Sequence, residues 1–298
     1  VQSAENVSQF DLDGDTATTF DNEMFGNNSF RHFSREITDW AGSVGLNFAV
    51  RKNLALYAAG ARGYKMPALD GFVNAVAQEQ VDLFDAEEVQ SLEAGVKAQV
   101  ANVAFTFDGF YAGLRNLIGQ GVELDSLTGA ARWVIEREPE TRSYGAEMET
   151  VAFPMNGLQL FGNATLLQAE FSTGADVGRR IIGVPRTIGN LAAVYSRGGA
   201  ELKADFHWVA SRPVEVGRGT TLPAYSYFNF GLGYALPGGG ARIDADLLNA
   251  FQAKGLEEGN PTAQSVPGSG LFLARPILPR RVTISLRYEL GGHAPAQP

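Results

Sequence analysis

Residues 281–290, Arg-Val-Thr-Ile-Ser-Leu-Arg-Tyr-Glu-Leu, alternate strictly between charged or hydroxylated side chains and apolar ones. The same two-residue period returns in residues 92–100, Leu-Glu-Ala-Gly-Val-Lys-Ala-Gln-Val, and in residues 201–208. Successive side chains of a β-strand point to opposite faces, so each stretch predicts a strand with one apolar and one polar face. Strands of this length that are separated by turns are typical of the wall of an outer-membrane β-barrel.

The two-residue period predicts about eleven strands in this chain. Their expected ranges are 37–50, 54–64, 89–101, 103–115, 141–153, 158–171, 186–196, 200–211, 224–236, 241–249 and 281–290. Short turns alternate with long loops, as they do in a membrane barrel whose long loops lie on one side. The predicted fold class is therefore all-β: an antiparallel, up-and-down transmembrane β-barrel wall of about 11–12 strands. Residues 1–36 are predicted to be a polar loop or an incomplete strand region, residues 37–290 the barrel, and residues 291–298 a tail.

The composition excludes several classes of protein. Hydrophobic residues make up 45% of the chain, so wholesale disorder is not expected. The net charge of −9 and the lack of a basic tract argue against a nucleic-acid partner. Without cysteine the chain cannot form disulfides or thiolate metal sites. No apolar run reaches the length of a membrane-spanning helix, and the first residues contain neither an initiator Met nor a signal core. We therefore expect either a removed signal or the interior of a longer protein.

A series of short phrases, taken together and in order, resembles the C-terminal half of TonB-dependent outer-membrane receptors. The phrases are Arg62-Gly63-Tyr64-Lys65-Met66-Pro67, Glu87 to Lys97, Gly145-Ala146-Glu147, Val184-Pro185-Arg186, Leu222 to Tyr225, Asn249-Ala250-Phe251 and Pro279-Arg280-Arg281. The resemblance runs from about residue 30 to about residue 290. Ala86 stands where the family usually has Pro, and the last strand ends in Leu290 where the family usually ends in Phe or Trp.

The resemblance implies a C-terminal part of a 22-stranded barrel with a plugged lumen in the outer membrane of a Gram-negative bacterium. It implies active uptake of a scarce nutrient, namely a ferric siderophore, cobalamin or a carbohydrate, and neither an enzyme nor a cofactor. The implied partners are outer-membrane lipid, the plug domain of the full-length receptor, TonB through that plug, the barrel-assembly machinery and the small nutrient. The alternative is a self-contained small outer-membrane β-barrel that acts as a passive pore or an adhesin. A soluble all-β binding protein fits the outward rows of apolar side chains less well.

Alternation predicts which charged residues face the barrel lumen, where water or a plug would accommodate mixed charge. They are Glu93, Lys97, Asp108, Glu147, Glu149, Glu201, Lys203, Asp205, His207, Arg242, Asp244, Asp246, Arg281, Arg287 and Glu289.

The long loops supply the candidates for ligand binding. These are Lys65, Asp70, Phe72, Asn74, Phe84 and Asp85 in the first loop, Trp133 and Arg137 in the second, Arg179 and Arg180 in the third, and Arg212, Glu215 and Arg218 in the fourth. Arginine suits an anionic ferric siderophore, and aromatic rings suit a sugar or a hydrophobic chelate.

Metal and catalytic chemistry find little support in the sequence. Residues 11–15, Asp-Leu-Asp-Gly-Asp, resemble the opening of a calcium loop, but Thr16 and Asn22 stand where an EF-hand requires glycine and an acidic residue. An ordinary acidic loop is favoured, a calcium site of another kind stays open, and no metal ligands are predicted. His207 follows Asp205 on one strand face, as in part of a hydrolase triad, but the chain contains no Gly-x-Ser-x-Gly elbow.

Overall fold

A computed structural model describes residues 2–7, 30–67, 85–124, 131–217, 219–237, 240–260 and 273–288. All regular elements within these ranges are β-strands, and none of the described residues forms a helix that could span a bilayer. The eleven long strands are β3 (Gly42–Arg51), β4 (Leu54–Lys65), β5 (Glu87–Val100), β6 (Val103–Arg115), β9 (Thr141–Met155), β10 (Leu158–Phe171), β11 (Thr187–Arg197), β12 (Ala200–Val209), β15 (Tyr225–Ala235), β16 (Ala241–Leu248) and β19 (Arg281–Tyr288).

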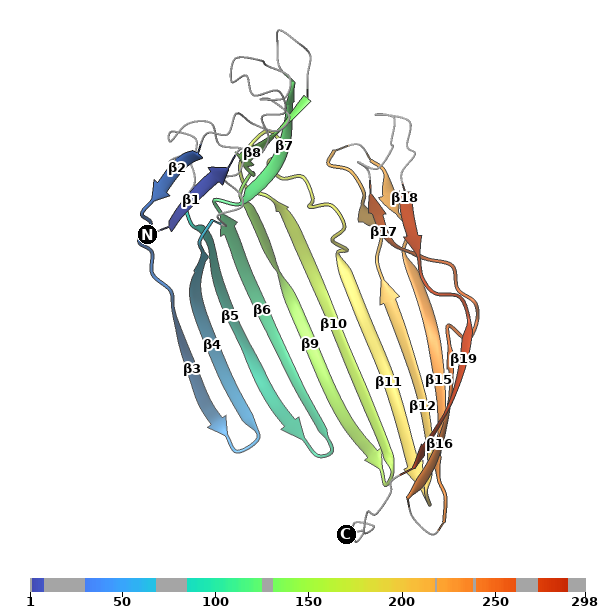
Figure 1. Cartoon of the computed structure of the whole chain (residues 1–298). Coiled ribbons are helices and arrows are strands. Elements are labelled where there is room, and N and C mark those ends of the chain that lie inside the picture. Colours follow the sequence, from blue (N-terminus) through green and yellow to red (C-terminus); the bar gives the residue numbers. More distant parts are fainter. Residues whose placement is uncertain are drawn as a thin grey trace. The chain divides into compact units, whose positions relative to one another are not determined.

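These strands form one sheet in the order β19-β16-β15-β12-β11-β10-β9-β6-β5-β4-β3, and Figure 1 shows consecutive strands running side by side. The predicted antiparallel all-β wall of about eleven strands is confirmed. Most boundaries differ by one or two residues, and the largest difference is at β3, which begins at Gly42, so that Trp40 lies before the strand that was expected from residue 37. β3 and β19 are the two edges, and within the described residues the sheet does not close on itself.

Four small hairpins lie outside the large sheet. They are β1 (Gln2–Val7) with β2 (Phe30–Arg35), β7 (Ile118–Leu124) with β8 (Ala131–Arg137), β13 (Arg212–Pro213) with β14 (Thr221–Leu222), and β17 (Leu256–Asn260) with β18 (Leu273–Pro276). The last three lie in segments that were expected to be long loops. We call the end of the strands that these long connections join the loop end, and the other end the turn end.

The turns at the turn end are as short as the sequence predicts. Between β11 and β12 the turn is Gly198-Gly199, with φ of 58° and 81°. Two consecutive residues with positive φ form the hairpin turn whose twist matches the twist of the strands, and only glycine adopts it without strain.

Cross-strand register separates the two faces of the sheet. Glu201, Gly233, Asp244 and Ser285 lie opposite one another on β12, β15, β16 and β19. The next row is Leu202, Leu232, Ala245 and Ile284, and because neighbouring rows point to opposite sides, one face is polar and the other apolar.

The buried hydrophobic side chains of the described residues lie near the loop end rather than between layers of the sheet. They are Ala86, Val214, Leu222, Ala250 and Ile277. The apolar face is exposed instead, so the sheet supplies no core of its own.

The chain divides into two compact units. The first comprises Val1–Ser43, Ala61–Ser91 and Gly113–Thr141, and it contains the loop ends of β4, β5 and β6. The second comprises Val44–Gly60, Leu92–Ala112 and Arg142–Pro298, and it contains the body of the sheet.

Candidate functional site

The polar face of β12, β15 and β16 carries a network of charges near the turn end. The Arg242 guanidinium binds Glu201 Oε1 and Asp244 Oδ1, both at 2.8 Å. Lys203 Nζ lies 2.9 Å from the same Glu201 oxygen. These predicted lumen residues share one face, as expected, and they are matched with one another rather than left without partners. Because its positive and negative charges are paired, such a surface is compatible with water and polar solutes and has no strong electrostatic potential of one sign.

Towards the loop end the same face becomes aromatic. The His207 ring stacks on Tyr227 with a centroid distance of 4.9 Å, and Tyr225 stacks on Tyr227 at 6.4 Å. His207 Nε2 lies 3.4 Å from Asp205 Oδ2, and Asn229 Nδ2 donates to that oxygen at 2.6 Å. The Asp205 carboxylate therefore contacts both the His207 imidazole and the Asn229 amide, and it is not paired with the imidazole alone.

Arg212, in the loop segment after β12, contacts the outermost ring of this stack. Its guanidinium lies 5.5 Å from the centre of the Tyr225 ring. Nη2 donates to the carbonyl oxygens of Leu256 and Glu257 at 2.5 and 2.6 Å, and the side chain is buried. Nη1 has no hydrogen-bond partner among the described residues. Arg212 was a ligand candidate, but its contacts fasten β13 to β17.

Asn249 organises the chain between β16 and β17. Its Oδ1 accepts the Ala253 N–H at 2.8 Å, and its Nδ2 donates to the carbonyls of Ala253 and Leu278 at 2.9 and 3.0 Å. The residue is buried and has φ of 46°, a conformation that asparagine tolerates better than most residues. Phe251 of the same phrase is exposed and packs edge-on against Phe228 at a centroid distance of 5.7 Å.

A second cluster lies on the polar face of β4, β5 and β6. Tyr57 Oη donates to Asp108 Oδ1 at 3.1 Å, and Lys97 Nζ lies 4.7 Å from the centre of the Tyr57 ring. Asp108 is buried. Lys97 contacts the face of the Tyr57 ring while Asp108 accepts from its hydroxyl, so this part of the polar face is also fixed by its own contacts.

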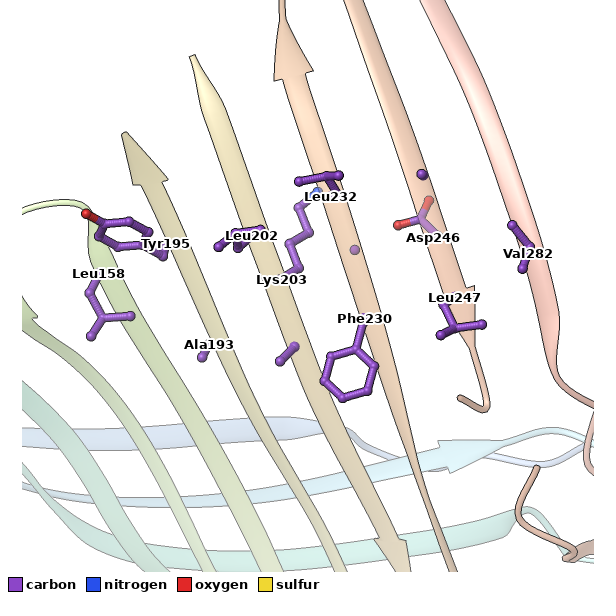
Figure 2. A pocket seen from close by; sticks show the side chains of 13 residues that line it. Leu158, Ala193, Tyr195, Leu202, Lys203, Phe230, Leu232, Asp246, Leu247 and Val282 are labelled. Atoms are coloured by element: carbon purple, nitrogen blue, oxygen red, sulfur yellow. The ribbon is translucent and has the colours of Figure 1, made fainter. Parts of the chain in front are cut away.

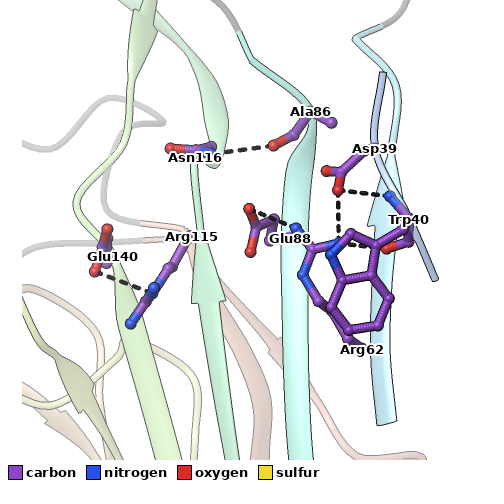
Figure 3. A network of polar contacts seen from close by, with 8 residues as sticks. All are labelled: Asp39, Trp40, Arg62, Ala86, Glu88, Arg115, Asn116 and Glu140. Carbon is purple, nitrogen blue, oxygen red and sulfur yellow. Dashed lines mark hydrogen bonds and ion pairs between the residues drawn. The ribbon is translucent and has the colours of Figure 1, made fainter. Parts of the chain in front are cut away.

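In the first unit, Arg62 joins three segments at the loop end (Figure 3). Its guanidinium lies 2.6 Å from Asp39 Oδ1 and 2.8 Å from Glu88 Oε1, and it stacks 4.7 Å from the centre of the Trp40 ring. The hydrogen bond from Arg62, together with that from the Trp40 backbone N–H, lowers the pKa of Asp39 below its usual value.

The structure brings some loop candidates together. Lys65 Nζ lies 3.0 Å from Glu87 Oε2, and Arg137 Nη2 lies 2.9 Å from Asp85 Oδ2. Both cations therefore reach the start of β5, Lys65 at its first residue and Arg137 two residues before it.

In the second unit the third loop supplies two more arginines. Arg179 pairs with Asp176 at 2.7 Å. Arg180 Nη2 donates to the Val184 carbonyl at 3.0 Å, and burial and then the nearby Arg186 charge lower the pKa of Arg180.

Other candidates cannot be placed in this way. Asp70, Phe72, Asn74, Phe84 and Arg218 lie outside the described residues, as do Asp11 to Asp15, and Trp133 lies in β8 where side chains are not described. Of the remaining motif residues, Gly145 lies so close to the Leu166 carbonyl that a Cβ would clash with it, and Glu147 accepts a hydrogen bond from Thr165 at 3.2 Å. Gly63 faces Val89, Tyr64 is exposed, and Pro67 is buried. Pro185 and Arg186 precede β11, where the Arg186 carbonyl accepts the Leu167 N–H at 2.7 Å.

Sequence reasoning missed several residues that make the closest polar contacts. Asp39 pairs with Arg62, and Arg142 Nε donates to Glu170 Oε1 at 2.8 Å. A usable signal was present, because Arg142 and Glu170 are charges at positions whose two-residue period is otherwise apolar. No group of three potential metal-binding side chains comes together within the described ranges.

The apolar face is hollowed over β10 to β19 (Figure 2). This hollow of about 530 Å³ is lined mainly by apolar side chains, among them Leu158, Leu202, Phe230, Leu247 and Val282. Since it offers few polar groups to orient a polar ligand, we take the polar face with its loop-end contacts as the candidate site.

Comparisons with known proteins agree on one architecture. Residues 5–250 match the family model "TonB dependent receptor-like, beta-barrel". No curated protein matches the chain. Among solved structures, the ferric yersiniabactin uptake receptor FyuA of Yersinia pestis is 18% identical with a TM-score of 0.67, over 88% of this chain and 39% of that one. The enterobactin-bound ferric enterobactin receptor PfeA of Pseudomonas aeruginosa is 19% identical with a TM-score of 0.65, over 83% of this chain and 40% of that one. The copper transporter OprC is 12% identical with a TM-score of 0.65, over 88% and 41%. This chain thus spans about two-fifths of their length.

Proposed function

The chain belongs to the TonB-dependent receptor β-barrel family, and from that premise we propose that it forms the C-terminal barrel part of an outer-membrane receptor for active nutrient uptake. The observation that carries the proposal is the two-faced sheet. Rows such as Leu202, Leu232 and Ile284 suit the lipid of the outer membrane, and the opposite rows suit an aqueous lumen.

The polar face would meet the plug domain of the whole receptor. Its charges are already paired with one another, as in Arg242 with Glu201 and Asp244. Paired charges cost little to bring against a polar domain and bind it weakly, which suits a plug that must move when TonB pulls on it. Folding into the membrane would depend on the barrel-assembly machinery of a Gram-negative bacterium.

The ligand class that we propose is an anionic ferric siderophore, with cobalamin or a carbohydrate as the competing classes. Arg179 is half-exposed in the third loop, and Arg180 lies beside the Arg186 charge. Arginine presents planar donors that match carboxylate and catecholate oxygens. FyuA and PfeA, by their names, take ferric chelates, whereas OprC takes copper, so the shared fold alone does not choose the ligand.

Uptake of radiolabelled ferric siderophores by cells that carry or lack the gene tests the proposal. We expect saturable uptake that disappears in a strain without TonB. Unsaturable entry of small sugars that is independent of TonB would instead favour the passive pore.

A matched pair of variants tests the role of the loops. Arg179→Gln removes a loop cation and should weaken siderophore binding several-fold. Arg197→Gln removes a cation at the turn end of β11 and should leave binding unchanged. Equal effects of the two variants would count against a ligand site in the loops.

A further inference from the structure

A cavity of about 160 Å³ opens on the polar face at the loop end of β15, β16 and β19. Its floor is formed by Tyr227 and Asn229 of β15 and by Leu248 at the end of β16. Leu248 belongs to the polar face because it follows Asp246 in the two-residue series and lies opposite Arg281, which also lines the cavity. All of these residues belong to the second unit.

The chain between β16 and β19 forms the other walls of the cavity. β17 contributes Glu257, and the segment before β19 contributes Ile277, Leu278 and Pro279. Figure 1 shows β17 and β18 at the loop end. On this side the wall is apolar apart from Glu257, so a ligand would meet a carboxylate beside an apolar surface.

Hydrogen bonds between protein groups hold these walls in place. Asn249 Nδ2 donates to the Leu278 carbonyl at 3.0 Å, and the Ile277 N–H donates to the Gly255 carbonyl at 3.0 Å. On the floor, Asn229 Nδ2 donates to a carboxylate of β12, and its Oδ1 accepts the Asn249 N–H at 2.8 Å. The cavity is therefore formed before a ligand arrives, which reduces the entropic cost of binding.

Two polar groups of the cavity are left for a ligand. Within the part of the chain that the structure describes, the Arg281 guanidinium makes no hydrogen bond or ion pair, and the Tyr227 hydroxyl makes no hydrogen bond. A guanidinium presents a planar fork of donors, and a phenol hydroxyl adds one more. These two groups suit a carboxylate.

Glu257 supplies a negative charge to the same cavity. Its Oε2 lies 3.3 Å from Arg275 Nε, but Arg275 also lies 3.4 Å from Glu258, and the side chains of all three residues are exposed. Exposed ion pairs of this kind contribute little free energy. Glu257 is therefore able to exchange its present partner for an ammonium group at little cost.

We propose that this cavity binds a small zwitterion of amino-acid size, with its carboxylate on Arg281 and Tyr227 and its ammonium group on Glu257. The volume equals that of roughly five water molecules at about 30 Å³ each, which suits an amino acid with a short side chain. Ile277 and Leu278 would contact that side chain. Drug-sized ligands occupy pockets of about 300–1,000 Å³, so this site is distinct from the one proposed for a siderophore.

Equilibrium dialysis of radiolabelled L-alanine against the purified full-length receptor in detergent tests the site. We expect saturable binding that unlabelled L-alanine abolishes. Acetate and methylammonium carry only one of the two charges, and L-tryptophan is larger than the cavity, so each should compete at least ten-fold more weakly. The absence of saturable binding would overturn the proposal, and so would acetate or methylammonium that competes as well as alanine.

A matched set of variants tests the assigned residues. Arg281→Gln and Glu257→Gln each remove one charge from the cavity, and both side chains are exposed, so neither variant removes a buried contact. Each should weaken alanine binding at least ten-fold. The control Arg287→Gln removes a cation from the same face of β19 outside the cavity and should leave binding unchanged.

Alanine binding that both cavity variants retain at the parent affinity would overturn the assignment of the site. This result bears on the cavity alone, because the proposed siderophore site is tested through Arg179, which does not line the cavity. Conversely, a failure of siderophore uptake would leave the alanine measurement unaffected, since the dialysis requires neither TonB nor a membrane.

Discussion

The sheet and the packed segments around β13, β14 and β17 differ in which side chains they expose. The sheet exposes large apolar side chains, whereas the packed segments bury apolar side chains and an arginine. In the sheet, Leu191 is 61% exposed and Ile284 is 74% exposed. In the packed segments, Leu222 is 1% exposed and even Arg212 is 3% exposed. A protein surrounded only by water would not expose such rows of large apolar side chains. The contrast is the one expected under the proposed function, in which lipid surrounds the wall and water surrounds the loops.

The two regions also differ in the partners of their polar side chains. On the wall, Arg242 bonds to the side chains of other strands. In the packed segments, Arg212 and Asn249 bond to backbone carbonyls. Removing a wall charge leaves water to take its place, whereas removing a buried amide leaves a carbonyl without a partner.

The largest expected effect comes from reversing the character of the apolar face. Leu191→Arg should destabilise the protein in lipid vesicles by about 2–4 kcal/mol, because the charge would lie in hydrocarbon. The neighbouring Ala192→Arg should cost less than about 1 kcal/mol, since residue 192 lies opposite Asp205 on the polar face. Urea unfolding followed by tryptophan fluorescence measures both. Equal costs would contradict the assignment of the two faces.

A smaller effect is expected at Asn249. Asn249→Ala removes three side-chain hydrogen bonds to the backbone and should cost about 2–3 kcal/mol in the same unfolding experiment. Asn249→Gly keeps the positive φ available but also lacks the amide, so it should be destabilised almost as much. A glycine variant as stable as the parent would show that backbone conformation, and not the amide, accounts for the residue.

The same substitution in both regions sharpens the contrast. Arg242→Met on the wall should cost about 1 kcal/mol or less, because its partners are partly solvated. Arg212→Met should cost about 2 kcal/mol, because the buried guanidinium makes two part-buried hydrogen bonds to carbonyls that then lose their donor. The denaturant midpoints of the two variants measure these costs. A larger shift of the midpoint for Arg242→Met than for Arg212→Met would contradict the contrast between the two regions.

The smallest expected effect is a pH transition at Asp39. Its pKa is lowered in the folded protein by Arg62 and the Trp40 N–H, so the folded state favours the carboxylate. The resulting stabilisation is fully present above the unfolded pKa and is lost as the pH falls through the lower, folded value. In a variant with Trp133→Phe and Trp208→Phe, Trp40 fluorescence should change only below about pH 4. Adding Asp39→Asn should abolish the transition, and a transition near neutral pH would contradict it.

Most of the wall could be predicted from sequence because alternation is a local signal. The ranges expected for β6 and β10 agree with the structure at both ends. The hairpins β7–β8 and β17–β18 were missed, because their alternation is short and weak against the surrounding loop residues.

The candidate site was less predictable. Arg212 was identified by residue type, but the carbonyls that hold it lie in a segment distant in sequence, and one of the two carbonyls that Arg180 contacts is 31 residues away. Likewise, the start of β3 was placed too early because the apolar series includes Trp40, whereas Arg62 of β4 holds that segment outside the strand. Such contacts depend on tertiary packing, which a two-residue period does not encode.

Within the described residues the large sheet has eleven strands, and this odd number limits what can complete it. Neighbours alternate in direction, so β3 and β19, the first and eleventh strands of the order, both run from the loop end to the turn end. Joining these edges directly would create a parallel pair, and so would inserting a second copy of the sheet in the same orientation. Antiparallel closure requires an odd number of additional strands whose two edges run from the turn end to the loop end, and a copy of this sheet in the same orientation lacks such edges.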